Sequence, residues 1–121
     1  MSQSVVLLER DPVLARSIIG GLRPHFSVHL THTREELRDN VAQSRPDAVV
    51  LNIEVTRLSD VENLHNEFPE LLIVCTHRIP DEDMWMAALA AGASDVCPCD
   101  DVGNVLSSIL RNSGMSDGAA A

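Results

Sequence analysis

The chain contains no lysine, and its nine basic residues are arginines scattered from Arg10 to Arg111 without forming a cluster. The formal net charge is −9. A chain this acidic, with no basic stripe, would be repelled by the phosphate backbone of a nucleic acid. We therefore expect no direct binding of DNA or RNA by these residues.

The sequence also lacks a long apolar run. No stretch approaches the length needed to span a bilayer, and the N-terminus has no signal pattern of charged and then apolar residues. These two absences predict a cytoplasmic protein without a membrane segment. The 121 residues suffice for one domain that buries a core without disulfides or a metal.

The cysteines are three in number, which argues against a disulfide framework. Cys97 and Cys99 flank a proline, and with Cys75 and His77 they could form a soft metal or redox site. Their spacing is not the Cys-x-x-Cys of zinc ribbons or redox motifs. Two of the three fall where strands should be buried, and cysteine is a common small core residue. A metal or thiol role is therefore the minor hypothesis.

Strand and helix signals alternate five times along the chain. Short apolar runs predict buried strands at 5–8, 48–52 and 71–76, with weaker strands at 27–31 and 95–97. Helices are predicted between them, and a last amphipathic stripe runs over 102–110. This alternation predicts an α/β fold with a parallel sheet and helices on both faces. We expect one domain over 1–112, followed by a flexible tail or linker over 113–121.

Helix starts are marked by capping residues. Asp11 precedes a proline at the first helical position, and Thr33 to Glu36 has the pattern of a capping box. Ser59 to Glu62 is a second candidate for such a box. Asp81 can cap a helix over 82–91 that stops at Gly92.

In parallel α/β sheets the functional crevice lies beyond the carboxyl ends of the strands. The residues that follow the predicted strands should therefore share one neighbourhood. They are Glu9, Arg10, Asp11, Asn52, Thr76, His77, Cys97, Pro98 and Cys99.

From Val5 to Leu110 the chain resembles the receiver domains of bacterial response regulators. That family has two acidic residues after strand one, a phosphate-accepting aspartate ending strand three, Thr or Ser ending strand four, and Lys-Pro after strand five. The segment Gly92 to Asp95 is similar to the family's Gly-Ala-x-Asp lead into strand five. The resemblance implies a flavodoxin-like, doubly wound sheet of five strands in the order 2-1-3-4-5.

The reactive residues of the family are mostly missing. Asn52 stands at the position of the phosphate acceptor, and a neutral amide cannot serve as the carboxylate nucleophile. Arg10 replaces the second acidic residue, where a guanidinium would oppose magnesium. Cys99 replaces the lysine. Glu9 and Thr76 remain, with Asp11 beside them, so the resemblance implies a vestigial pocket that lacks conventional phosphorylation and needs no cofactor.

Arg10 has two interpretations. It is either a solvated loop arginine or a built-in cation that pairs with Glu9 at the place of magnesium, which would fix one conformation. The aromatic residue that commonly follows the Asp before strand five is Val96 here. A rotating aromatic side chain coupled to Thr76 is therefore not expected.

The helix predicted over 82–91 has no polar residue from Met84 to Ala91. Either Trp85, Ala88 and Leu89 are buried beneath an alanine-rich surface, or the helix forms part of a partner interface. In receivers the fourth helix, fifth strand and fifth helix commonly form the dimer or output face. The interface residues that we predict on this basis are Met84, Trp85, Ala88, Val96 and Val105.

The leading hypothesis is a phosphorylation-independent pseudo-receiver, a regulatory module that binds a protein partner and could be homodimeric. One alternative is a response regulator with an unusual acceptor, Glu9 or Asp11, or with a small ligand in the vestigial pocket. The other is a sensor built on the cysteines. An enzyme is not expected, because Glu9, Asp11, Thr76 and His77 form no recognised catalytic set.

Overall fold

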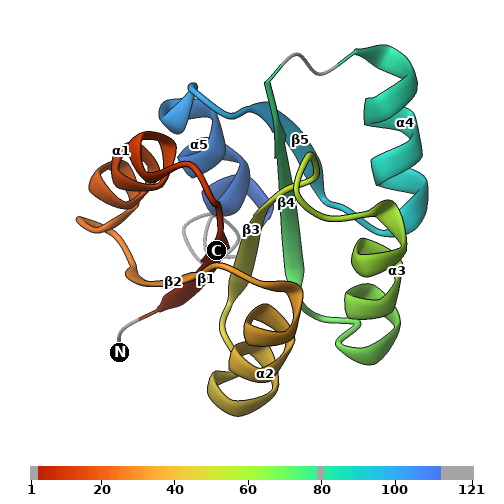
Figure 1. Ribbon diagram of the computed structural model, residues 1–121, viewed down its shortest axis with the longest axis horizontal. Coiled ribbons are helices and arrows are strands. Elements are labelled where there is room, and N and C mark those ends of the chain that lie inside the picture. Colours follow the sequence, from red (N-terminus) through yellow and green to blue (C-terminus); the bar gives the residue numbers. More distant parts are fainter. Residues whose placement is uncertain (1–2, 79–80, 113–121) are drawn as a thin grey trace, which may run out of the picture.

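The computed structural model describes residues 3–78 and 81–112, so the tail predicted over 113–121 lies outside the described residues. The described chain forms a parallel sheet of five strands in the order β2-β1-β3-β4-β5, flanked by five helices. Figure 1 shows the sheet in the centre with the helices around it. The predicted doubly wound α/β fold and strand order are confirmed.

The elements alternate strictly along the chain. The strands are β1 Ser4–Leu8, β2 Ser27–Thr31, β3 Ala48–Asn52, β4 Leu72–His77 and β5 Asp95–Pro98. The helices are α1 Pro12–Leu22, α2 Arg34–Ser44, α3 Leu58–Glu67, α4 Glu82–Ala91 and α5 Val102–Asn112. No helix in the described part of the chain is long and apolar enough to cross a membrane.

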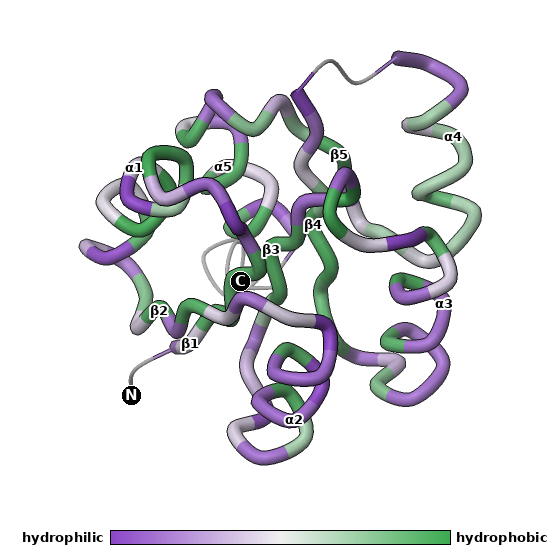
Figure 2. Tube along the Cα trace, in the orientation of Figure 1, coloured by the Kyte–Doolittle hydropathy of each residue, from purple (hydrophilic) through white to green (hydrophobic). Residues whose placement is uncertain are grey.

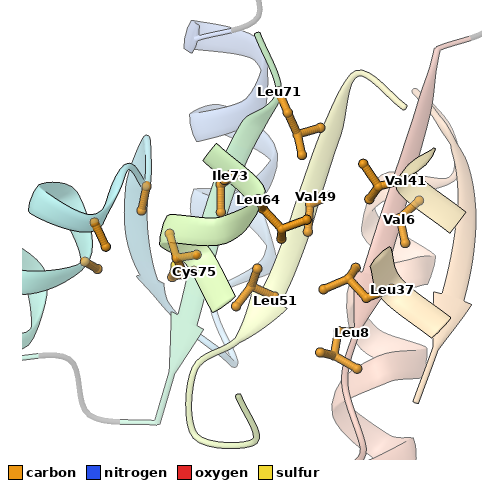
Figure 3. Close-up of a cluster of buried hydrophobic side chains, with 14 of the residues drawn as sticks. Val6, Leu8, Leu37, Val41, Val49, Leu51, Leu64, Leu71, Ile73 and Cys75 are labelled. Atoms are coloured by element: carbon orange, nitrogen blue, oxygen red, sulfur yellow. The ribbon is translucent and has the colours of Figure 1, made fainter. Parts of the chain in front are cut away.

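The two faces of the sheet form separate hydrophobic layers, because successive strand residues point to opposite faces. One layer joins alternate residues of the strands to the inner sides of α2, α3 and α4 (Figure 3). The other layer joins the remaining strand residues to α1 and α5. In Figure 2 the traces of β3 and β4 are mostly green, whereas α2 and α3 carry both green and purple segments. Because the five strands are parallel, their carboxyl ends lie together at one edge of the sheet.

Most helix starts follow the predicted caps. The Asp11 side chain accepts hydrogen bonds from the backbone N–H groups at the start of α1, and Thr33 and Glu36 form the predicted capping box of α2. The box predicted at Ser59 is wrong, because α3 already begins at Leu58. There the Asp60 carboxylate instead accepts a hydrogen bond of 2.9 Å from the backbone N–H of Arg57.

The helix α4 ends as predicted at Gly92, which has a φ of +118°. This left-handed conformation lets the Gly92 N–H reach the last carbonyls of the helix, and glycine adopts it without a steric penalty. The turn then leads into β5. Gly92 thus connects the helix α4 to the strand at the edge of the sheet.

Candidate functional site

Glu9, Asn52 and Thr76 lie together at the carboxyl edge of the sheet, as predicted. Asn52 ends β3 and is in register with Thr76 of β4, while Glu9 follows β1, the neighbour of β3 on its other side. All three side chains are buried. The topology therefore gathers residues that are far apart in sequence into one polar cluster at the centre of the sheet edge.

The Glu9 carboxylate is hydrogen bonded entirely by the protein. The Asn52 Nδ2 donates to Glu9 Oε1 at 3.0 Å and to Oε2 at 3.2 Å. The backbone N–H groups of Arg10 and Asp11 donate to Oε2 at 3.0 and 3.1 Å. The carboxylate is only 2% exposed. A buried anion needs such donors, and here one side-chain amide and two backbone amides supply them.

The orientation of the Asn52 amide follows from its neighbours. Its Oδ1 accepts a hydrogen bond of 2.8 Å from the backbone N–H of Glu54, which leaves the NH₂ group facing Glu9. The backbone carbonyl of Asn52 also accepts a hydrogen bond of 3.1 Å from the Thr56 hydroxyl. Both polar groups of the side chain are therefore engaged. The amide links β1, β3 and the loop after β3.

The Arg10 side chain does not pair with Glu9. Its Nε donates to the backbone carbonyl of His32 at 3.3 Å, and the residue is exposed. Both residues follow the end of β1 at Leu8: the Glu9 side chain is buried and bonded to Asn52, whereas the Arg10 side chain reaches the loop after β2. The hypothesis of a built-in cation at the place of magnesium is therefore corrected, and the interpretation as a solvated loop arginine holds.

The residues around Glu9 do not fit a magnesium ion. The ion needs several oxygen ligands with free lone pairs, preferably carboxylates. The amide nitrogen of Asn52 faces Glu9, and the Asp11 carboxylate caps α1 through bonds to Val13 N and Leu14 N. No group of three or more His, Cys, Asp or Glu residues in the described ranges could hold a metal ion.

Thr76 has a buried hydroxyl that finds no hydrogen-bond partner among the described residues, in contrast to its neighbours Glu9 and Asn52. The Thr76 backbone carbonyl accepts a bond of 3.0 Å from Ile53 N. The family's threonine or serine is thus present at the end of β4. Its side chain takes no part in the hydrogen-bond network that Glu9 and Asn52 form.

A second network, which the sequence did not indicate, ties the loop after β3 to the end of β4. Glu54 accepts a hydrogen bond of 3.0 Å from Arg78 N, and its carboxylate lies 3.8 Å from His77 Nε2 and 3.9 Å from Arg78 Nε. The Cys99 backbone N–H donates to the His77 carbonyl at 3.0 Å. Glu54 thereby holds the loop after β3 and the end of β4 together beside the polar cluster of Glu9, Asn52 and Thr76.

The three cysteines are all buried and free. Cys75 packs in the layer with α2, α3 and α4, and Cys97 in the layer with α1 and α5, so these two thiols point to opposite faces of the sheet. Burial raises the pKa of Cys75 to about 12, and burial is also the main cause of the raised pKa values of Cys97 and Cys99. The raised pKa values disfavour the reactive thiolate form of all three, and Cys75 and Cys97 are part of the hydrophobic core.

We expect the three thiols to react with a disulfide reagent at pH 8 only when the protein unfolds. A thiol with a pKa of about 12 is ionised to roughly one part in ten thousand at that pH, and the thiolate is the reactive form. The measurement is the labelling rate with and without urea. Fast labelling of any thiol in the native protein would contradict this expectation and support the hypothesis of a sensor built on the cysteines.

The same pKa predicts a loss of stability at high pH. In the unfolded chain Cys75 ionises near its ordinary value of 9.0, whereas in the folded chain it keeps its proton to about 12. The free energy of unfolding should therefore fall as the pH rises from 9 towards 12. Cys75→Ala should show a smaller fall over that window.

The structure buries some of the predicted interface residues and exposes others. Ala88 and Val105 are fully buried, so these two cannot present a surface and the prediction is wrong for them, while Val96 keeps an exposed fraction of 8%. Trp85 is exposed and Met84 is partly exposed. Met86 and Leu89 are exposed and were missed. An apolar helix without a polar side gives no sign of which large residues point outward.

Comparisons with known proteins agree with this fold. No family model matches the chain. It is 29% identical over 105 residues to the response regulator MprA of Mycobacterium tuberculosis, covering 81% of this chain and 44% of that protein. The chain thus spans about half the length of the curated relatives that it matches.

Two solved structures share the fold at low sequence identity. The receiver domain of the response regulator NarL from Mycobacterium tuberculosis gives a TM-score of 0.81 at 13% identity, covering 93% of this chain and 96% of that one. An atypical orphan response regulator, described as having a phosphorylation-independent regulatory mechanism, gives 0.83 at 19%, covering 92% and 95%. The chain is therefore similar in sequence to a response regulator and shares its fold with receiver domains of response regulators.

Proposed function

We propose that this chain is a receiver domain that works without phosphorylation of residue 52 and acts by binding a protein partner. The observation that supports this most directly is the hydrogen bonding of Asn52 to Glu9. An amide occupies the place of the nucleophile and satisfies the remaining carboxylate. The Glu9 carboxylate therefore has its hydrogen-bond donors without a phosphoryl group.

The chemistry of phosphoryl transfer supports the same conclusion. An acyl phosphate forms when a carboxylate oxygen attacks phosphorus, and neither polar group of Asn52 is such a nucleophile. Phosphoryl transfer also relies on cations that stabilise the charge of the transferring group. The chain has no lysine, and Cys99 stands at the family's lysine position with its side chain buried.

Glu9 and Asp11 are poor substitutes for the missing acceptor. The Glu9 carboxylate is buried and accepts four hydrogen bonds. An Asp11 oxygen accepts two hydrogen bonds that begin α1, so its modification would compete with the helix cap. Neither residue therefore favours the hypothesis of an unusual acceptor.

A domain of this kind would change state through binding alone. A partner that prefers one of two conformations shifts the population by its difference in affinity for them, and no turnover is required. The partner surface in this proposal is the side of the molecule formed by α4, β5 and α5. The similar structure described as phosphorylation-independent provides a precedent for such regulation in this fold.

The test is the intact mass of the protein after incubation with acetyl phosphate and magnesium, compared with that of Asn52→Asp. We expect no phosphoryl gain in the natural protein, because no free carboxylate occupies the acceptor position. We also expect none in Asn52→Asp, because the lysine is missing. A receiver with its reactive residues intact serves as the positive control.

The outcomes separate three cases. A phosphoryl gain in the natural protein would overturn the proposal, and the modified residue would then be mapped. Modification of Asn52→Asp alone would mean that only the nucleophile has been lost. The natural protein would still be phosphorylation-independent, but Cys99 in place of lysine would matter less than argued above.

A further inference from the structure

The helix α4 has its large apolar side chains on the outside. Three of the large hydrophobic residues that are exposed in the described ranges belong to this helix. They are Trp85, Met86 and Leu89, with exposed fractions of 43%, 58% and 37%. Its inner side consists instead of small residues, because Ala88 and Ala91 are the ones that it buries. Figure 2 shows white and green colours along the length of α4, with purple at its N-terminal end.

The position of α4 leaves this apolar side uncovered. The helix contacts α3 and β5 and lies at the margin of the molecule (Figure 1). A surface that combines an exposed tryptophan with a methionine and a leucine has the composition of an interface core. We call Trp85, Met86 and Leu89 the outer face of α4.

A hollow of about 360 Å³ adjoins this outer face. It is lined by Asp81, Glu82, Trp85, Asp95, Val96 and Asn104. Asp95 is bound by Arg111 at 3.2 Å and by the Ser108 hydroxyl, and Asp81 caps α4 through a bond of 2.8 Å to Met84 N. The hollow therefore combines the apolar side chain of Trp85 with the acidic side chains of Asp81, Glu82 and Asp95.

Apart from Arg111, which pairs with Asp95 at 3.2 Å, the charged residues of α4, β5, α5 and the loops between them are acidic. The stretch from Ile79 to Leu110 contains six acidic residues and no arginine, lysine or histidine. Glu82 and Asp83 are exposed and form no ion pair with any residue in the described part of the chain. A second copy docked on this side would oppose like charges, which costs affinity. The charge favours a basic partner.

We infer that the outer face of α4 binds a basic amphipathic segment of another protein. Apolar side chains of that segment pack on Trp85, Met86 and Leu89, and its arginines or lysines bind Glu82, Asp83 and the acidic hollow. Helical segments commonly bind apolar surfaces in this way, through anchors spaced three and four residues apart. The inference rests on the proposed function, because it names the chemistry of the partner that the proposal requires.

The probe is a pair of synthetic amphipathic peptides with identical leucines at helical spacing. One has arginine at its polar positions and the other has glutamate. Trp85 is the only tryptophan of the chain, so its fluorescence reports binding at the surface in question. We expect the basic peptide to change this fluorescence saturably, and the acidic peptide to bind at least about tenfold more weakly. Added salt should weaken the basic peptide.

Matched variants locate the site. Glu82→Gln combined with Asp83→Asn should weaken the basic peptide severalfold, whereas Glu35→Gln combined with Glu62→Gln removes the same charge from α2 and α3 and should leave binding unchanged. Leu89→Ala should weaken it as well. Val13→Ala, which changes an apolar residue of α1 that is 74% exposed, should not.

Three results would overturn the inference: equal binding of both peptides, binding of neither, or a concentration-dependent dimer in sedimentation whose formation requires Leu89. The natural protein and its variants are first measured without a phosphoryl donor. Binding that occurs without phosphorylation but vanishes after acetyl phosphate treatment would contradict the proposed function and leave the surface assignment intact.

Discussion

Replacing Gly92 by alanine should destabilise the domain by about 3 kcal/mol or more, enough to remove much of the stability of a small protein. Two effects act in the same direction. The φ of +118° lies where residues with a Cβ are strained, and an added Cβ would lie 2.5 Å from His65 Cγ and 2.6 Å from His65 Cβ. The ring of His65 can rotate, but its Cβ is fixed to α3. The two helices must therefore separate.

Gly20→Ala is the matched control for this substitution. Gly20 lies in α1, has no positive φ, and a Cβ there would meet nothing within 4 Å. Alanine at an exposed helical position reduces the entropy of the unfolded chain, so we expect a gain of about 0.5–1 kcal/mol. The measurement is urea unfolding of both variants beside the natural protein. A midpoint for Gly92→Ala as high as that for Gly20→Ala would contradict the packing of α3 against α4.

The order of the elements could be read from the sequence because buried parallel strands leave a simple pattern. Runs such as that over 48–52 are apolar on both sides, and each is followed by a capped helix. The strand ends are harder to place, since β5 extends one residue past its predicted end to Pro98 and β4 lies one residue later than predicted, at Leu72–His77. The start of α3 was missed because Asp60, rather than Ser59, forms the hydrogen bond that begins the helix.

The polar cluster could be predicted only in part. The topology places Glu9, Asn52 and Thr76 together, but the direct bond between the first two depends on side-chain orientation. Of the two interpretations of Arg10, the structure supports the solvated loop arginine, and the sequence could not decide between them because Arg10 lies in the loop beyond the end of β1. Glu54 was overlooked, since it lies in a loop whose path no periodic pattern describes.

The interface prediction failed for a physical reason. Between Met84 and Ala91 every residue is apolar, so the sequence does not show which side of the helix is buried. In the fold α4 buries Ala88 and Ala91, whereas Ala87 and Ala90 are exposed together with Trp85, Met86 and Leu89. Neither polarity nor size alone separates the two sides of this helix, because alanines lie on both.

Asn52→Asp should cost about 3 kcal/mol of stability at pH 7, although the two side chains have almost the same shape. The substitution removes the group that donates to Glu9 at 3.0 Å and places a second negative charge there, in a site where Glu9 is only 2% exposed. A buried charge without its partner is among the most destabilising changes known. Because a proton shared between the two carboxyls would restore a donor, the deficit should shrink as the pH falls towards about 4.

The charge-swapped variant tests whether the hydrogen bond itself is the cause. In Asn52→Asp combined with Glu9→Gln, the glutamine amide can donate to the new carboxylate. The glutamine oxygen can still accept the N–H groups of Arg10 and Asp11, and the aspartate can accept that of Glu54. In Glu9→Gln alone, the NH₂ group of the new glutamine faces the NH₂ group of Asn52, and neither group can accept a hydrogen bond from the other. The two single substitutions should therefore be strongly non-additive, with the double variant recovering at least half of the summed loss in urea unfolding. Additive losses would mean that Asn52 does not hold the Glu9 carboxylate, and the main support for a receiver domain that works without phosphorylation would be gone.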